Sequence, residues 1–111
     1  MLQSIISTQN EQRDERGSGG EMKTIELIIS GRVQKVGFRA CIRHIATSLG
    51  ISGEVENLPD GRVHVLATGE DVILEKFVSM LYSCPRAIIR DIDMRTFILT
   101  DFPDFSIKRP L

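Results

Sequence analysis

The chain has 111 residues, a net charge of −1, an aromatic content of 5% and no tryptophan, and 41% of its residues are hydrophobic. This length favours a single domain, and the near-neutral charge gives no electrostatic reason to expect nucleic acid or an anionic membrane as a partner. The few aromatic residues argue against base stacking on single strands, and no apolar run is long enough to cross a bilayer.

Residues 1–22 are polar and glycine-bearing, without clear periodicity, which predicts a disordered N-terminal extension before a domain at residues 23–111. No basic region precedes the short apolar piece near the start, so we expect no signal peptide. The two cysteines, Cys41 and Cys84, are too few for a disulfide framework or a zinc site. We expect both to stay reduced, Cys41 as a small core residue, in a cytoplasmic, monomeric protein.

Hydrophobic periodicity predicts a series of strands and helices after residue 23. Strands are expected at residues 24–30, 51–58, 62–67, 87–97 and 105–108, and helices at residues 38–48 and 71–82. The order β-α-β-β-α-β, followed by a short C-terminal strand, is that of the α+β, ferredoxin-like split β-α-β fold. That fold has a mostly antiparallel sheet with both helices on one face.

The turn at residues 31–39, between the first strand and the first helix, is the first candidate site. The backbone N–H groups of a helix's first turn have no internal partners and, with the helix dipole, attract phosphate or carboxylate. No Ser, Thr, Asp or Asn lies between Gly31 and Arg39 to cap the helix, so these N–H groups are open to an outside acceptor. Arg39 lies in the first helical turn and could bind the same anion through its guanidinium. A tight turn with Arg39 in solvent would explain the spacing equally well.

This turn is not a Walker A loop. Gly37 is followed by Phe38, whereas that motif requires Gly-Lys and then Ser or Thr. Nothing in the segment would hold magnesium, and we expect no metal.

A second candidate residue, Asn57, ends the second predicted strand. In the predicted topology the first two strands run in the same direction, so their C-terminal ends meet at one edge of the sheet. Asn57 can therefore approach the turn and Arg39, where its side-chain amide could position a water molecule. It could instead serve the turn before Pro59, and position alone does not decide between these roles.

These residues resemble the acylphosphatase signature, Gly-x-Val-Gln-Gly-Val-Gly-Phe-Arg. The matching positions are Gly31, Val33, Gln34, Val36, Gly37, Phe38 and Arg39. The chain differs from the signature at Lys35, where the family usually has glycine. A second block, residues 49–63, also resembles the family, although Glu54 stands where a bulky residue such as Trp is usual, and we expect Glu54 on the exposed sheet face. The resemblance covers residues 23–108.

The resemblance implies hydrolysis of the carboxyl-phosphate bond of small acyl phosphates by direct attack of water, with no metal or cofactor. It implies a phosphate-binding loop and two catalytic residues, Arg39 and Asn57, of which Asn57 orients the water. The implied phosphate-binding residues are Gln34, Lys35, Val36, Gly37, Phe38 and Arg39. The leaving carboxylate has a conjugate acid with a pKa of about 4, so it departs without a general acid. The resemblance implies no phosphoenzyme.

Lys35 leaves a second hypothesis open. If the backbone at this position has a positive φ, a lysine strains the loop, and the protein could be a non-catalytic module that only binds anions. The ammonium group could instead attract phosphate, or it could simply extend into solvent. An RNA-recognition sheet has the same order of elements but needs exposed aromatic residues on its third strand, and residues 62–67 contain none.

Overall fold

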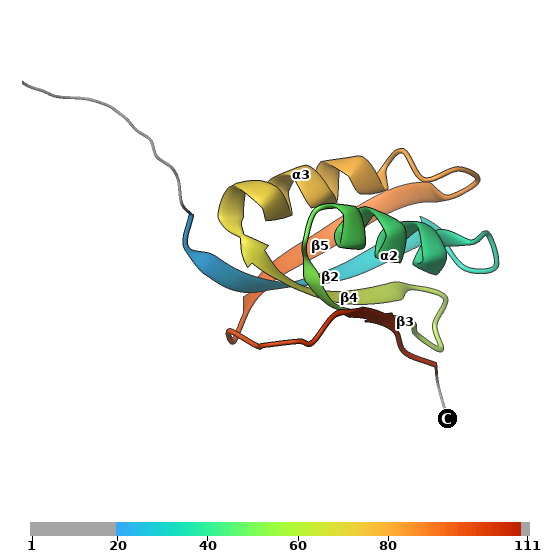
Figure 1. The fold of residues 1–111 in the computed structure, drawn as a ribbon. Helices are drawn as coiled ribbons and strands as arrows, with labels where there is room; N and C mark the ends of the chain where they lie inside the picture. Colours follow the sequence, from blue (N-terminus) through green and yellow to red (C-terminus); the bar gives the residue numbers. More distant parts are fainter. Residues whose placement is uncertain (1–19, 110–111) are drawn as a thin grey trace, which may run out of the picture.

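Five strands and two helices make up most of residues 20–109, the part of the chain that this computed structural model describes. The elements are β2 (Met22–Arg32), α2 (Phe38–Ser48), β3 (Ser52–Asn57), β4 (Val63–Glu70), α3 (Asp71–Leu81), β5 (Ile88–Phe97) and β6 (Phe105–Ile107) (Figure 1). The order is the predicted one, and the largest difference is that β4 continues to Glu70 rather than ending at Ala67. Most of the predicted N-terminal extension, residues 1–19, lies outside the described residues, and β2 already begins at Met22.

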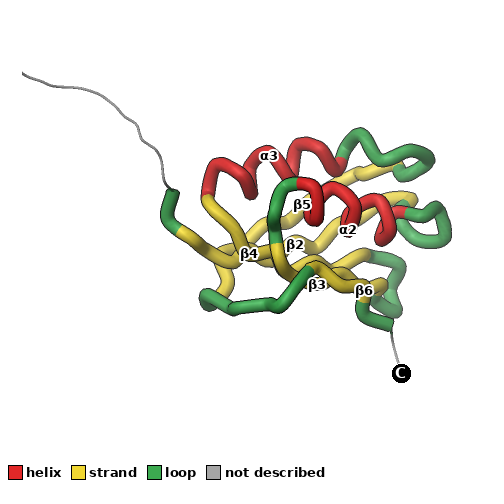
Figure 2. The backbone as a smooth tube through the Cα atoms, in the orientation of Figure 1, coloured by secondary structure: helices red, strands yellow, loops and turns green. Residues whose placement is uncertain are grey.

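The strands form one sheet in the order β5-β2-β4-β3-β6. The pairs β2–β4, β2–β5 and β3–β4 are antiparallel, and only β3–β6 is parallel. Both helices lie on the same face of this sheet (Figure 2). The predicted α+β, ferredoxin-like arrangement is therefore confirmed.

The core fills the space between the helices and the sheet. Alternate strand residues point toward the helices, as Ile25, Leu27 and Ile29 do in β2, and each is at most 3% exposed. The helices contribute Phe38, Ile42, Ile45, Ala46, Leu74, Phe77 and Leu81. Full burial of such a side chain contributes roughly 1.5–3 kcal/mol, so this layer holds the first turn of α2 firmly on the sheet.

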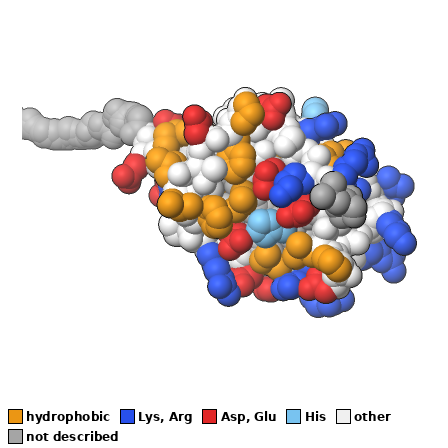
Figure 3. Space-filling model, turned by 90° about the horizontal axis from the view of Figure 1, so that it is seen from below, with side chains coloured by type: hydrophobic (Ala, Val, Ile, Leu, Met, Phe, Trp, Pro, Cys, Tyr) orange, Lys and Arg blue, Asp and Glu red, His pale blue; other side chains and the backbone are white. Residues whose placement is uncertain are grey.

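The opposite face of the sheet is not covered by helices and carries charged side chains next to hydrophobic ones (Figure 3). His64 lies there between two carboxylates, 2.8 Å from Glu26 and 3.7 Å from Glu56. Lys108 makes ion pairs with Glu54 at 3.5 Å and with Glu56 at 3.9 Å. Glu54 therefore lies on the exposed face, as predicted, on the opposite side of the sheet from the helices.

The two cysteines form a disulfide, which corrects the prediction that both stay reduced. Cys41 in α2 is bonded to Cys84, which follows α3, and their Cα atoms are 6.0 Å apart. Cys41 is only partly buried and packs against the core rather than lying within it. A count of two cysteines separated by 43 residues carries no pairing signal, because the packing of α2 against the end of α3 brings them together. The argument for a reducing compartment is lost with this prediction.

Within residues 20–109 no helix has the length and apolar character that a membrane span requires.

Candidate active site

The site lies where β2 and β3 end, on either side of β4. Ile29 of β2 and Asn57 of β3 both pair with Val63, at the start of β4. The ends of the two strands therefore meet at one edge of the sheet, roughly 10 Å apart because one strand separates them. α2 begins at the same edge, after the short loop that follows Arg32.

The start of α2 presents free backbone donors. Gly37 is the N-cap residue, with a φ of 76° and no side chain capping the helix. The first hydrogen bond of the helix runs from the Cys41 N–H to the Gly37 carbonyl, at 3.1 Å. No group in the described part of the chain accepts a hydrogen bond from the backbone N–H groups of residues 34–40, and the first turn contains no acidic residue. These N–H groups point to an anion as the missing acceptor.

Gln34 anchors the loop to the neighbouring turn. Its Nε2 donates hydrogen bonds to the carbonyls of Leu58 and Arg62, both at 2.9 Å. Because both amide hydrogens are engaged, the side chain has no N–H group left for a phosphate. Only the backbone N–H of Gln34 can take the predicted phosphate-binding role.

Lys35 has the positive φ on which the hypothesis of a non-catalytic module depends. Its φ is 63°, a conformation that costs a residue with a Cβ roughly 1–2 kcal/mol. Its side chain is exposed and reaches the rim of the site. The loop nevertheless keeps its free N–H groups, because the side chain of Gln34, the residue before Lys35, is hydrogen-bonded to the turn at residues 58–62.

A hollow of about 230 Å³, here called the Arg39 hollow, opens between the loop, α2 and the ends of β3 and β6. Its lining residues are Val33, Lys35, Gly37, Phe38, Arg39, Ala40, Asn57, Ile107 and Arg109. Arg39 and Asn57 thus share one hollow, as the topology predicts. Gln34 and Val36, both predicted phosphate-binding residues, do not line it.

The side chain of Asn57 has an unused acceptor. Its Oδ1 is buried and has no hydrogen-bond partner among the described residues. The following turn is held by other groups, because the Leu58 N–H donates to the Arg62 carbonyl and the Arg62 N–H donates to Asp60. Buried polar atoms in proteins are nearly always hydrogen-bonded, so this oxygen marks a place for a water or a ligand.

The Arg39 hollow is cationic. Lys35, Arg39 and Arg109 line it, no carboxylate does, and within residues 20–109 none of the three makes an ion pair. Arg86 is also near, since a Cβ built on Gly37 would lie 3.5 Å from its Nη2. On the adjoining turn, hydrogen bonds from Arg62 hold the pKa of Asp60 below its usual value.

Arg109 is a site residue that the sequence reasoning missed. β6 runs parallel to β3 with Ile107 opposite Val55, so two residues further on Arg109 comes beside Asn57. Arg109 also falls on the same side of the chain as Ile107, which lines the hollow. In the sequence, the only sign of this role is that Arg109 falls two residues after Ile107 and so on the same side of the chain. That sign could be used only after the pairing of β6 with β3 and its register were known.

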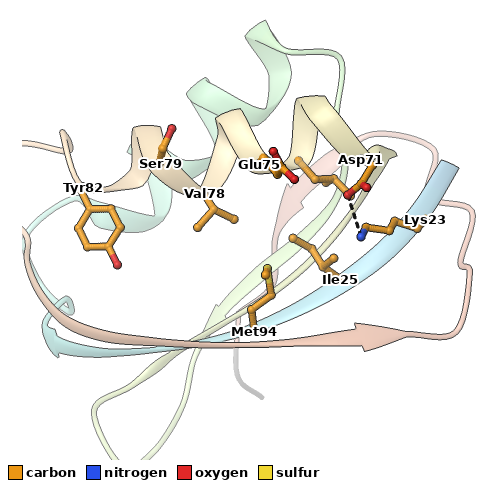
Figure 4. A pocket seen from close by; sticks show the side chains of 9 residues that line it. Lys23, Ile25, Asp71, Glu75, Val78, Ser79, Tyr82 and Met94 are labelled. Carbon is orange, nitrogen blue, oxygen red and sulfur yellow. Dashed lines mark ion pairs between the residues drawn. The ribbon is translucent and has the colours of Figure 1, made fainter. Parts of the chain in front are cut away.

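A larger hollow of about 350 Å³, here called the α3–β5 hollow, lies between α3 and the sheet. Its walls include Ile25, Val78 and Met94, and an ion pair of 2.8 Å between Lys23 and Asp71 lies at its edge (Figure 4). Neither of the predicted catalytic residues lines it. The Arg39 hollow is smaller but holds convergent donors, and among the described residues no group of three or more His, Cys, Asp or Glu could hold a metal ion.

The family model for acylphosphatase matches residues 25–107. This chain belongs to the acylphosphatase family. An acylphosphatase of Methanocella arvoryzae is 49% identical over 88 residues, which cover 78% of this chain and 100% of the relative. An acylphosphatase of Archaeoglobus fulgidus is 41% identical over 87 residues, with 78% and 98% covered. The crystal structure of acylphosphatase from Bacillus subtilis matches with a TM-score of 0.75 at 33% identity, over 79% of this chain and 99% of that one. The predicted family is thereby confirmed.

Proposed function

We propose that this protein hydrolyses the carboxyl-phosphate bond of small acyl phosphates and releases a carboxylate and inorganic phosphate. One observation carries the proposal: Arg39, Asn57 and the first turn of α2, whose N–H groups have no acceptor within residues 20–109, line the same hollow. Family membership and the relatives named acylphosphatase support it.

In this mechanism the phosphoryl group occupies the start of α2. Backbone N–H groups of Lys35 and of residues 37–40, which line the hollow, and the Arg39 guanidinium donate hydrogen bonds to its non-bridging oxygens. The positive end of the helix dipole adds to the attraction. These donors are in place before the substrate binds, so the charge of the transition state is stabilised without reorganisation of the site.

Asn57 positions the attacking water. Its Oδ1 accepts a hydrogen bond from the water, which holds the water oxygen in line with the bond that breaks. The new bond joins the water oxygen to phosphorus, and the bond from phosphorus to the acyl oxygen breaks. The leaving carboxylate takes the electron pair, and both protons of the water stay with the phosphate, which is released as H2PO4− and then equilibrates with solvent.

The chemistry requires no further catalytic group. A carboxylate whose conjugate acid has a pKa of about 4 leaves without being protonated. The residues that line the hollow include no Ser, Cys, His or Asp, so we expect direct transfer to water and no phosphoenzyme. Covalent phosphate on the protein after turnover would contradict this step.

The proposal also includes a monomeric, cytoplasmic protein that acts on a small molecule and not on nucleic acid. The Cys41–Cys84 disulfide removes the cysteine argument for the cytoplasm, so that location stays a prediction, to be tested by fractionation of cells. The predicted monomer is tested by light scattering of the purified protein.

The function is tested by phosphate release from acetyl phosphate and benzoyl phosphate. We expect Arg39→Ala to lower kcat/KM at least about 100-fold, through loss of phosphate affinity and of transition-state stabilisation. Asn57→Ala should leave the affinity for phosphate as it is and lower kcat, because it removes only the acceptor for water.

Arg43→Ala is the matched control for both variants. Arg43 is exposed, lies one turn after Arg39 in α2 and does not line the hollow, so its removal should leave both constants unchanged. The assignment fails if Arg39→Ala and Asn57→Ala both hydrolyse acyl phosphates as fast as the parent.

A further inference from the structure

The Arg39 hollow has more positive charge than one phosphoryl group requires. A phosphoryl dianion is largely balanced by the Arg39 guanidinium and the helix start, whose partial charge is about +0.5. Lys35 and Arg109 line the same hollow and form no ion pair within residues 20–109. Within residues 20–109, two cations therefore remain without an anion when one phosphoryl group is bound.

The strand geometry separates Arg109 from the charges of the open sheet face. Lys108, its neighbour in the chain, lies on that face and pairs with Glu54 and Glu56. Its backbone N–H donates to the Val55 carbonyl at 2.8 Å, which continues the β3–β6 ladder to this residue. By alternation Arg109 projects to the other side, into the hollow beside Asn57.

We propose that Arg109, with Lys35, forms a second anion subsite, and that the preferred substrate is an acyl phosphate whose acyl part carries another anionic group. This inference rests on the proposed function and specifies its substrate class. The phosphoryl group binds at Arg39, and the second anion, a carboxylate or a phosphate, binds at Arg109. The partly exposed side chain of Ile107 provides an apolar wall for the short carbon chain that joins the two anions.

The test compares two acyl phosphates that differ only in the second charge. Succinyl phosphate carries a terminal carboxylate, and butyryl phosphate has an uncharged methyl group in its place. We expect kcat/KM to be about fivefold higher for succinyl phosphate, the ratio typical of one partly solvated charge pair. Arg109→Gln should bring this ratio close to one, Arg109→Lys should restore part of it, and Lys35→Gln should lower it.

Lys108→Gln is the matched control, because it removes the adjacent cation from the opposite face and should leave the ratio unchanged. The same ratio in Arg109→Gln as in the parent overturns the inference, even if both compounds are hydrolysed.

Failure of the proposed function is distinguished by binding. If neither compound is hydrolysed, calorimetry measures the affinity for two stable ketophosphonates. One is 5-phosphono-4-oxopentanoate, which carries a terminal carboxylate, and the other is 2-oxopentylphosphonate, whose tail is uncharged. Tighter binding of the first compound, lost in Arg109→Gln, supports the second subsite. Equal affinities for the two compounds overturn it.

Discussion

Lys35 combines two opposing effects in one residue. Its φ of 63° is a conformation that glycine adopts without cost, whereas its side chain adds a cation at the edge of the Arg39 hollow. The local strain is held by contacts elsewhere, since Gln34 is fixed to the carbonyls of Leu58 and Arg62. The loop therefore keeps its shape at the expense of some stability, as is common at functional sites.

We expect Lys35→Gly to raise the free energy of unfolding by about 1 kcal/mol, because glycine removes the left-handed penalty. Urea denaturation measures this change. Lys76→Gly is the control: Lys76 is exposed inside α3, where a change to glycine should lower stability by about 1 kcal/mol. A loss of stability in both variants would show that Lys35 is not strained.

Phosphate release by the parent at a rate comparable to Lys35→Gly would exclude the non-catalytic alternative.

At the scale of the elements, the fold was largely predictable because its signals are local. The alternation in β2 and the helical spacing in α2 follow from neighbouring residues, and the order of elements then places Arg39 and Asn57 at one sheet edge. The missed features depend on distant partners. Gln34 bonds to carbonyls 24 and 28 positions away, and Arg109 reaches the hollow only through the pairing of β6 with β3.

The disulfide is the clearest of these non-local features. It ties α2, two residues beyond Arg39, to the turn that carries Arg86 close to Gly37. The bond therefore fixes the turn after α3 to α2, close to the loop that precedes α2. We expect it to stabilise both the fold and the position of a cation beside the loop.

Reduction of the disulfide should lower the free energy of unfolding by roughly 3–4 kcal/mol. The chain-entropy relation gives about this value for a closed loop of 43 residues, out of a typical total of about 5–15 kcal/mol. Urea denaturation with and without dithiothreitol measures it. The variant Cys41→Ala/Cys84→Ala should be as unstable as the reduced parent and should not respond to dithiothreitol. Equal stability of the oxidised and reduced parent would contradict the prediction.

The whole molecule separates its charges despite a net charge of −1. Carboxylates on the open sheet face are paired with His64 and Lys108, whereas Lys and Arg side chains gather at the end of the molecule where α2 begins (Figure 3). A substrate dianion approaching that end meets a local positive field rather than the net charge. A local positive field and the net charge predict opposite effects of salt on kcat/KM, so a measurement can distinguish them.

We expect kcat/KM for an acyl phosphate to fall roughly threefold as the ionic strength rises from about 0.01 to about 0.1 M, because the Debye length shrinks from about 30 to about 10 Å. Most of the change should be in KM, since chemistry inside the hollow is less screened than the approach to it.

Sucrose at matched osmolarity should have no such effect. Arg109→Gln should weaken the salt dependence, and Lys108→Gln, which removes a cation paired on the other face, should not. A rise of kcat/KM with salt is the result that the net charge alone predicts for a dianion, and it would show that the cations around the Arg39 hollow do not govern the encounter.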